Sequence, residues 1–253
     1  MKTRRFNKKI KAQFPRVKFK LLEVNIVFYK TRYRSRILIP QEPPTRDIGW
    51  MASGFIYRAL QRSRMLFFEF INNINNGNVL SSYYLVRGHF ETTAAVAALS
   101  KALKDCYAQD ITYEELATTI LTLGIGTRYF RPENFPDEPT TIEFPQAINV
   151  ITRITRADEM YSNILNLDET PGRFADAFNL LSEFCHPNVG GLSIGSEVQS
   201  NLDITFQKNP NFNEENLKRL ITCMGMSSSF FFHVYDNCLS MLKDNEEMPE
   251  IIE

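Results

Sequence analysis

The stretch SSYYLVRGHFETTAAVAAL, residues 81–99, decides the fold class of this 253-residue chain. At about 100° per residue, its apolar side chains gather on one stripe of a helix. That stripe consists of Tyr83, Val86, Phe90, Ala94 and Ala97. The pattern predicts a long helix over residues 79–107 whose apolar stripe is buried by neighbouring helices.

Helical periodicity continues on both sides of this stretch. It predicts further helices over 47–75, 112–123, 145–165, 173–186 and 213–243. Asp47 suits an N-cap, Thr112 and Glu115 match a capping box, and Pro145 suits a first helical position. Residues 189–211 break the period and contain short alternating stretches. We therefore expect an all-α bundle of about six helices, with a small β-hairpin before the last one.

The N-terminal segment differs from the rest in charge. Residues 1–36 hold 13 Lys or Arg and one acid, Glu23, whereas the whole chain has a net charge of zero. The prolines of PQEPP, residues 40–44, fix the backbone and interrupt periodic structure. They place a boundary near Pro44, between a basic extension over 1–45 and a helical domain over 46–253. Within the extension, VNIVFY, residues 24–29, alternates weakly and suits a strand.

Aromatic residues are interleaved with the basic ones in RVKFK, residues 16–20, and FYKTRYRSR, residues 28–36. This pattern suits phosphate contacts combined with stacking on nucleic-acid bases. The candidate nucleic-acid-binding residues are Arg4, Arg5, Lys8, Lys9, Lys18, Lys20, Arg32, Arg34 and Arg36. Two alternatives remain open: a solvated arm, or one that docks on the acidic body of the chain itself.

The four cysteines show no CxxC spacing and imply no disulfide framework, which favours a reducing compartment. No apolar run reaches the roughly 18–20 residues that a membrane span needs. We therefore expect a cytoplasmic protein without a membrane partner.

Two charged residues of the central stretch are candidates for function. Arg87 and Glu91 are spaced i,i+4, so they form a pair at the edge of the apolar stripe, beside the small residues Ala95 and Ala98. Such a pair can face a cavity between helices and orient a polar ligand or a catalytic group. The alternative is a structural salt bridge that reaches water. His89 points about 200° away from Glu91, so we expect it to face solvent or another helix and to be structural.

A second candidate lies in LSEFCHPNVGG, residues 181–191. His186 directly precedes a proline at the predicted end of a helix. It can cap that helix, because the helix dipole favours a cation there. It can also serve as a general acid or base, since the histidine pKa suits that work near neutrality. Glu183 and His186 have the E-x-x-H spacing of di-iron bundles, but the chain lacks a second such motif. We therefore expect no metal and no cofactor.

Together these motifs resemble a group of uncharacterised bacterial helical proteins with an Arg-x-x-x-Glu helix and a later Ser-Glu-x-x-His-Pro-Asn motif. That group is distantly similar to HEPN domains, helical modules associated with nucleotides and RNA in toxins and phage defence. The resemblance covers about residues 50–245. The matching positions are Arg87, Glu91, Ser182, Glu183, His186, Pro187 and Asn188.

The resemblance implies a metal-independent ribonuclease site with His186, Arg87, Glu91 and Glu183 in catalysis, and with Ser182 and Asn188 binding the ligand. One departure is important. In HEPN ribonucleases four to six residues separate an arginine from the histidine, but the corresponding positions before His186 hold Asn179, Leu180 and Leu181 here. Arg87 is expected to supply the missing cation from another helix.

The sequence thus favours an RNA- or nucleotide-associated helical domain, with RNA, a nucleotide or a second copy of the chain as partner. The alternative is a non-catalytic protein-interaction module in which Arg87–Glu91 and Glu183–His186 form a structural polar network. A third interpretation is a hydrolase or binder that holds a small ligand between helices.

Overall fold

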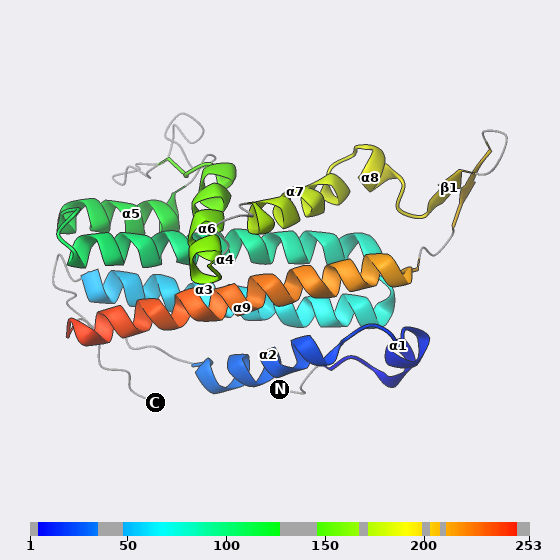
Figure 1. Ribbon diagram of the computed structural model, residues 1–253, viewed down its shortest axis with the longest axis horizontal. Helices are drawn as coiled ribbons and strands as arrows, with labels where there is room; N and C mark the ends of the chain where they lie inside the picture. The colour runs from blue at the N-terminus through cyan, green and yellow to red at the C-terminus, as the bar shows by residue number, and fades with distance from the viewer. Residues whose placement is uncertain are drawn as a thin grey trace, which may run out of the picture.

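The computed structural model describes residues 5–34, 48–126, 146–166, 172–198, 203–207 and 211–246. Within these ranges the chain is an all-α bundle with one small β-hairpin, as the periodicity predicts (Figure 1). Three predicted features fall on residues outside the described ranges: the domain boundary at Pro44, the helix N-cap at Asp47 and the helix start at Pro145.

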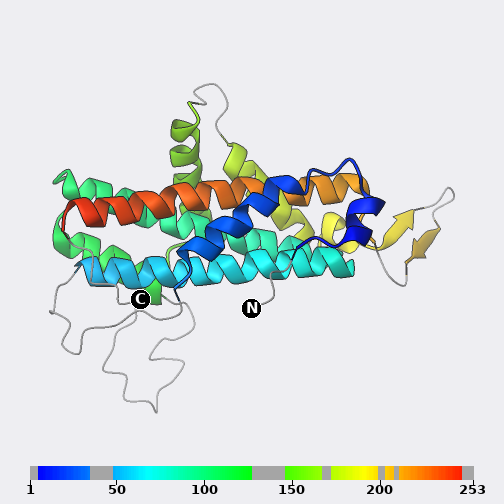
Figure 2. The same cartoon turned by 90° about the horizontal axis from the view of Figure 1, so that it is seen from below.

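Three long helices form the centre of the bundle: α3 (Ile48–Asn76), α4 (Val79–Tyr107) and α9 (Glu214–Asp244). They run side by side in both views (Figures 1 and 2). Gly77 adopts a left-handed conformation with φ of 74°, which lets the chain reverse sharply between α3 and α4. The stripe predicted on α4 is buried, with Tyr83 and Phe90 fully inaccessible to solvent.

The basic N-terminal segment contributes two helices to the bundle, α1 (Lys8–Gln13) and α2 (Lys20–Arg32). α2 lies across α3 and α9 (Figure 2). The predicted strand over residues 24–29 is therefore wrong. Leu22, Ile26 and Tyr29 recur at helical spacing and are buried in the common core, so tertiary packing prevails over the β propensity of the valines and isoleucine.

Three shorter helices cover the opposite side of α4: α5 (Tyr113–Ile125), α6 (Val150–Ile164) and α7 (Arg173–Cys185) (Figure 1). The capping box of α5 is confirmed, because Thr112 and Glu115 exchange side-chain to backbone hydrogen bonds of 3.2 and 2.8 Å. The predicted start of the fourth helix at residue 145 is wrong. α6 begins at Val150, where the Asn149 side chain accepts a hydrogen bond from the Ile151 amide at 3.0 Å.

α7 is held in place by a residue of α6. Its N-cap residue, Gly172, has a left-handed backbone and no side chain to serve as a cap. The Asp158 carboxylate accepts hydrogen bonds from the amides of Gly172, Phe174 and Ala175 at 2.8, 2.7 and 3.0 Å. A negative charge at the helix N-terminus also complements the helix dipole. Asp158 therefore fixes where α7 starts over α4.

After α7 the chain forms the short helix α8 (Val189–Leu192) and a hairpin of β1 (Ser196–Val198) and β2 (Ile204–Phe206). The strands are antiparallel, with Ser196 opposite Phe206, so the expected small hairpin is confirmed. This unit projects from one end of the bundle (Figure 1). None of the described helices combines the length and the apolar character that crossing a membrane requires.

Candidate functional site

Arg87 and Glu91 form the expected i,i+4 pair on α4. Arg87 Nε lies 3.4 Å from Glu91 Oε1, and the Arg87 guanidinium carbon lies 5.3 Å from the centre of the Phe178 ring of α7. Burial raises the pKa of the Cys185 thiol, also of α7, and the nearby charge of Arg87 opposes that rise. The pair thus sits at the edge of the core, where α7 packs on α4.

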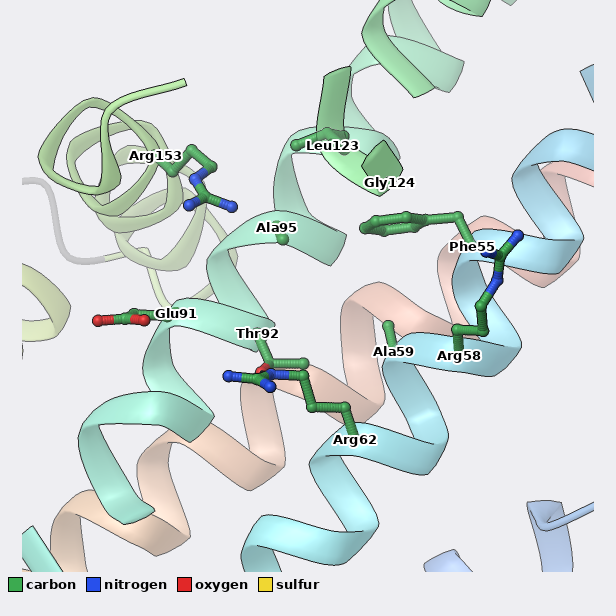
Figure 3. A pocket seen from close by; sticks show the side chains of 10 residues that line it. All are labelled: Phe55, Arg58, Ala59, Arg62, Glu91, Thr92, Ala95, Leu123, Gly124 and Arg153. Carbon is green, nitrogen blue, oxygen red and sulfur yellow. The ribbon is translucent and has the colours of Figure 1, made fainter. Parts of the chain in front are cut away.

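Glu91 also lines a cavity of about 320 Å³, whose other lining residues belong to α3, α4, α5 and α6. Three arginines line it with Glu91: Arg58 and Arg62 of α3, and Arg153 of α6. Figure 3 shows Arg62 and Arg153 reaching toward the cavity from opposite sides. Among the described residues that line it, three side chains are positive and one is negative, a balance that favours an anionic ligand.

The remaining wall of the cavity is apolar. The Phe55 ring projects into the space, with Ala95 of α4 to its left and Ala59 of α3 below it (Figure 3). The two alanines are too small to fill the gap between α3 and α4, and Leu123 of α5 covers the cavity from above in Figure 3. The cavity therefore has a charged side and an aromatic side, as a site for an amphipathic small ligand would.

Two of the arginines are held in place by hydrogen bonds, one to the neighbouring helix α4 and one within α3. Arg62 Nε donates to Thr92 Oγ1 at 3.1 Å, and the Thr92 hydroxyl donates to the Gly88 carbonyl at 2.8 Å. Arg58 Nε donates to the Gly54 carbonyl at 2.9 Å. Because Nε makes these bonds, the two terminal nitrogens of each guanidinium are left for other acceptors.

Sequence reasoning identified Glu91 but missed the arginines and Phe55. A signal was present on α3, since Phe55, Arg58 and Arg62 are spaced i, i+3 and i+7 and therefore share one face. Arg153 had no such signal, because it comes from a helix distant in the sequence.

The Ser-Glu-x-x-His-Pro-Asn motif builds the turn from α7 into α8. Ser182 Oγ donates to the Phe178 carbonyl at 2.9 Å, and Asn188 Nδ2 donates to Glu183 Oε2 at 2.7 Å. Asn188 Oδ1 accepts from the Gly191 amide at 3.1 Å and so caps α8. Of this motif, the structure therefore brings Glu183 together with Asn188.

His186 is the C-cap residue of α7, and its side chain is exposed. Among the described residues, its imidazole has no hydrogen-bond partner. The chain leaves α7 through extended residues rather than a left-handed one, and α8 folds back so closely that a side chain on Gly191 would collide with the His186 carbonyl oxygen. The motif thus has a structural role in this turn.

The cavity and the C-terminal end of α7 contact different positions along α4. Tyr84 donates its hydroxyl to the Cys185 carbonyl, whereas Ala95 lines the cavity. At 1.5 Å per residue these two positions are about 16 Å apart along the helix. Of the predicted catalytic residues, Arg87 and Glu91 lie together on α4, whereas His186 lies at the C-cap of α7.

A buried polar cluster surrounds His89, which is fully inaccessible to solvent and faces neighbouring helices. Its Nε2 lies 2.9 Å from Tyr29 Oη of α2 and 2.8 Å from Ser63 Oγ of α3, and its Nδ1 lies 2.8 Å from Ser227 Oγ of α9. Burial lowers the pKa of His89 to about 3, so the ring is neutral at physiological pH. His89 therefore connects four helices through hydrogen bonds, which is a structural role.

The candidate nucleic-acid-binding residues fall into three groups. The side chains of Lys8, Lys9, Lys18 and Lys20 are exposed, as are those of Arg5 and Arg34. Arg32 is docked on the body of the protein. Its guanidinium donates to Asp236 of α9 at 2.9 and 2.7 Å and lies 3.7 Å above the Phe28 ring. Arg4 and Arg36 lie outside the described residues.

Comparison with family models, curated proteins and solved structures finds no match for this chain. The similarity to HEPN domains therefore stays a prediction.

Proposed function

We propose that the protein binds a nucleoside phosphate in the cavity between α3, α4, α5 and α6. The observation that supports this most directly is a cavity lined by Arg58, Arg62, Arg153 and Phe55, with Arg62 and Arg153 turned toward it from different helices. This proposal keeps the nucleotide association expected from the sequence and moves its centre to the α3 face of α4.

The charged side suits the phosphate. A guanidinium presents several donors in a planar fork that matches phosphate oxygens, and hydrogen bonds between ions are about twice as strong as neutral ones. Arg62 and Arg153 approach from opposite sides, so a phosphate between them would be bound by two cations (Figure 3). The bond from Arg62 to Thr92 lowers the conformational entropy that this side chain loses on binding.

The aromatic side suits the base. Phe55 offers a ring face for stacking, and Ala59, Ala95 and Leu123 provide an apolar surround. Glu91 can only accept hydrogen bonds when ionised, so it selects ligand groups that donate, such as ribose hydroxyls. A cavity of about 320 Å³ is at the lower end of the range for small-molecule sites, which fits one nucleotide unit.

A nucleoside phosphate can be a free nucleotide or the end of an RNA strand. The exposed lysines of α1 and α2 would add sequence-independent contacts to a strand but not to a free nucleotide. The two sources share the same chemistry in the cavity, and a binding experiment separates them.

That experiment measures equilibrium binding of AMP, adenosine, ribose 5-phosphate and a short RNA with or without a 5′-phosphate. We expect AMP to bind more tightly than ribose 5-phosphate, and adenosine to bind least. Phe55→Leu should weaken AMP but leave ribose 5-phosphate unchanged. Tighter binding of the 5′-phosphorylated RNA than of AMP would identify the strand end as the ligand. Equal binding of AMP and adenosine would contradict the proposal.

A further inference from the structure

The β-hairpin and the preceding helix α8 expose apolar side chains. Ile204 and Phe206 of β2 are 55% and 80% exposed, and Val189 and Leu192 of the preceding helix α8 are 84% and 68% exposed. In the described part of the chain the sheet has only these two strands. An isolated two-stranded hairpin is marginally stable in water. The exposed apolar residues and the marginal stability of two strands both indicate that a binding partner covers this part of the surface.

The register shows which backbone groups of β2 face outward. The Gln207 amide donates to the Gly195 carbonyl at 2.8 Å, so these residues form a hydrogen-bonded pair. Pairs alternate along an antiparallel ladder, and Thr205 opposite Glu197 is therefore the next hydrogen-bonded pair. The amides and carbonyls of Ile204 and Phe206 then point away from β1, to the open edge of β2.

This edge is complementary to itself. A two-fold axis through Thr205 would place Ile204 opposite Phe206 of a second copy, and Phe206 opposite its Ile204. Both positions have outward-facing backbone groups, so the pairing would form four N–H···O bonds. Ile204 and Phe206 lie two residues apart and hence on one face of the strand, so the new cross-strand neighbours are apolar in both places.

We propose that two copies of this chain associate through β2, in antiparallel register about Thr205, to form a four-stranded sheet. An isologous contact of this kind needs one surface only and closes as a dimer. It removes the open edge of β2, which would otherwise pair with other chains. The proposal uses no residue of the cavity, so it stands or fails independently of nucleotide binding.

Cross-linking tests the register directly. In the proposed dimer Thr205 and its copy form a non-hydrogen-bonded pair, with Cα atoms about 4.5 Å apart. That distance permits a disulfide. The four native cysteines are buried and do not compete. We expect Thr205→Cys to form a covalent dimer under mild oxidation, while the wild type and Ser193→Cys, an exposed control at the C-cap of α8, do not.

Sedimentation equilibrium supplies the second measurement. The wild type should be dimeric, and Phe206→Lys should be monomeric because a lysine blocks the edge. A matched control, Val24→Lys, replaces an exposed apolar residue of α2 and should leave the dimer intact. A monomeric wild type whose Thr205→Cys variant does not cross-link would overturn the proposal. So would a dimer that survives Phe206→Lys, because another surface would then hold it.

Discussion

Arg62 of α3 and Thr92 of α4 are joined by a hydrogen bond of 3.1 Å from Nε to Oγ1. The bond crosses the interface between the two helices at the wall of the cavity. It holds the guanidinium where a ligand phosphate can reach its terminal nitrogens. Because Thr92 donates to its own helix at Gly88, its hydroxyl oxygen is oriented to accept from Arg62.

Removal of Arg62 should weaken nucleotide binding. Arg62→Ala deletes a charge-assisted contact worth about 1.5–3 kcal/mol, which corresponds to roughly a 10- to 150-fold rise in Kd for AMP. Arg64→Ala is the matched control, since Arg64 is on the same helix and stacks on Tyr33 instead of lining the cavity. Fluorescence titration with a labelled nucleotide measures both. Equal losses in the two variants would show that general charge, and not the cavity, binds the ligand.

Acid should destabilise the protein through His89. The folded state holds this ring neutral with a pKa of about 3, whereas the unfolded chain takes up a proton near pH 6.5. Since the unfolded state binds more protons, the His89 contribution is complete above pH 6.5 and is lost as the pH falls toward 3. We expect the free energy of unfolding to fall by up to about 1.4 kcal/mol per pH unit below pH 6.5.

Urea unfolding at pH 7.5 and at pH 5.5 measures this loss in the wild type and in His89→Gln. The variant should have a lower stability at both pH values but a shallower pH dependence, because it lacks the titrating group. Identical pH dependence in the two proteins would assign the acid sensitivity to other residues.

The turn after α7 should be more sensitive at its glycines than at its histidine. Gly191→Ala places a methyl group against the His186 carbonyl and should cost about 1–3 kcal/mol. Gly190→Ala, where the nearest atom is 3.1 Å away, should cost less. His186→Ala should change stability by less than about 0.5 kcal/mol, because the side chain is exposed. Thermal unfolding ranks the three variants, and a His186→Ala loss as large as that of Gly191→Ala would contradict this account.

The resemblance to HEPN ribonucleases has its own test. Wild type and His186→Ala are incubated with labelled structured and unstructured RNA in the presence of EDTA. No described residue orients the His186 imidazole through a hydrogen bond, and the Arg87 side chain is paired with Glu91. We therefore expect neither protein to cleave. Cleavage that survives EDTA and disappears in the variant would instead make His186 a catalytic residue.

Much of the fold could be predicted, because the spacing of apolar residues along a helix reflects which side of the helix is buried. The stripe through Tyr83 and Phe90 predicted α4 correctly, and the Thr112–Glu115 spacing predicted the cap of α5. The errors arose where local signals compete. Valine and isoleucine in residues 24–29 favour a strand, but helical packing against α9 prevails. Pro145 suits a helix start, but the Asn149 side chain caps α6 four residues later.

The site was less accessible to sequence reasoning. Arg87 and Glu91 could be paired because both lie on one helix, where spacing determines direction. Arg153 could not be joined to them, because the packing of α6 on α4 brings it to the cavity. A histidine is a stronger sequence signal for a catalytic site than an arginine, because arginines are common on helix surfaces. His186 was therefore predicted as a site residue, and the arginines that line the cavity were not.

A pair of variants on α6 tests the central claim most directly. Arg153 lines the cavity, whereas Arg156, one turn later on the same helix, is exposed and does not line it. Isothermal titration calorimetry with AMP compares wild type, Arg153→Ala and Arg156→Ala. The account predicts a Kd at least about tenfold higher for Arg153→Ala, from the loss of a charge-assisted contact, and an unchanged Kd for Arg156→Ala. Equal affinities in all three proteins, or no measurable binding to the folded wild type, would contradict it.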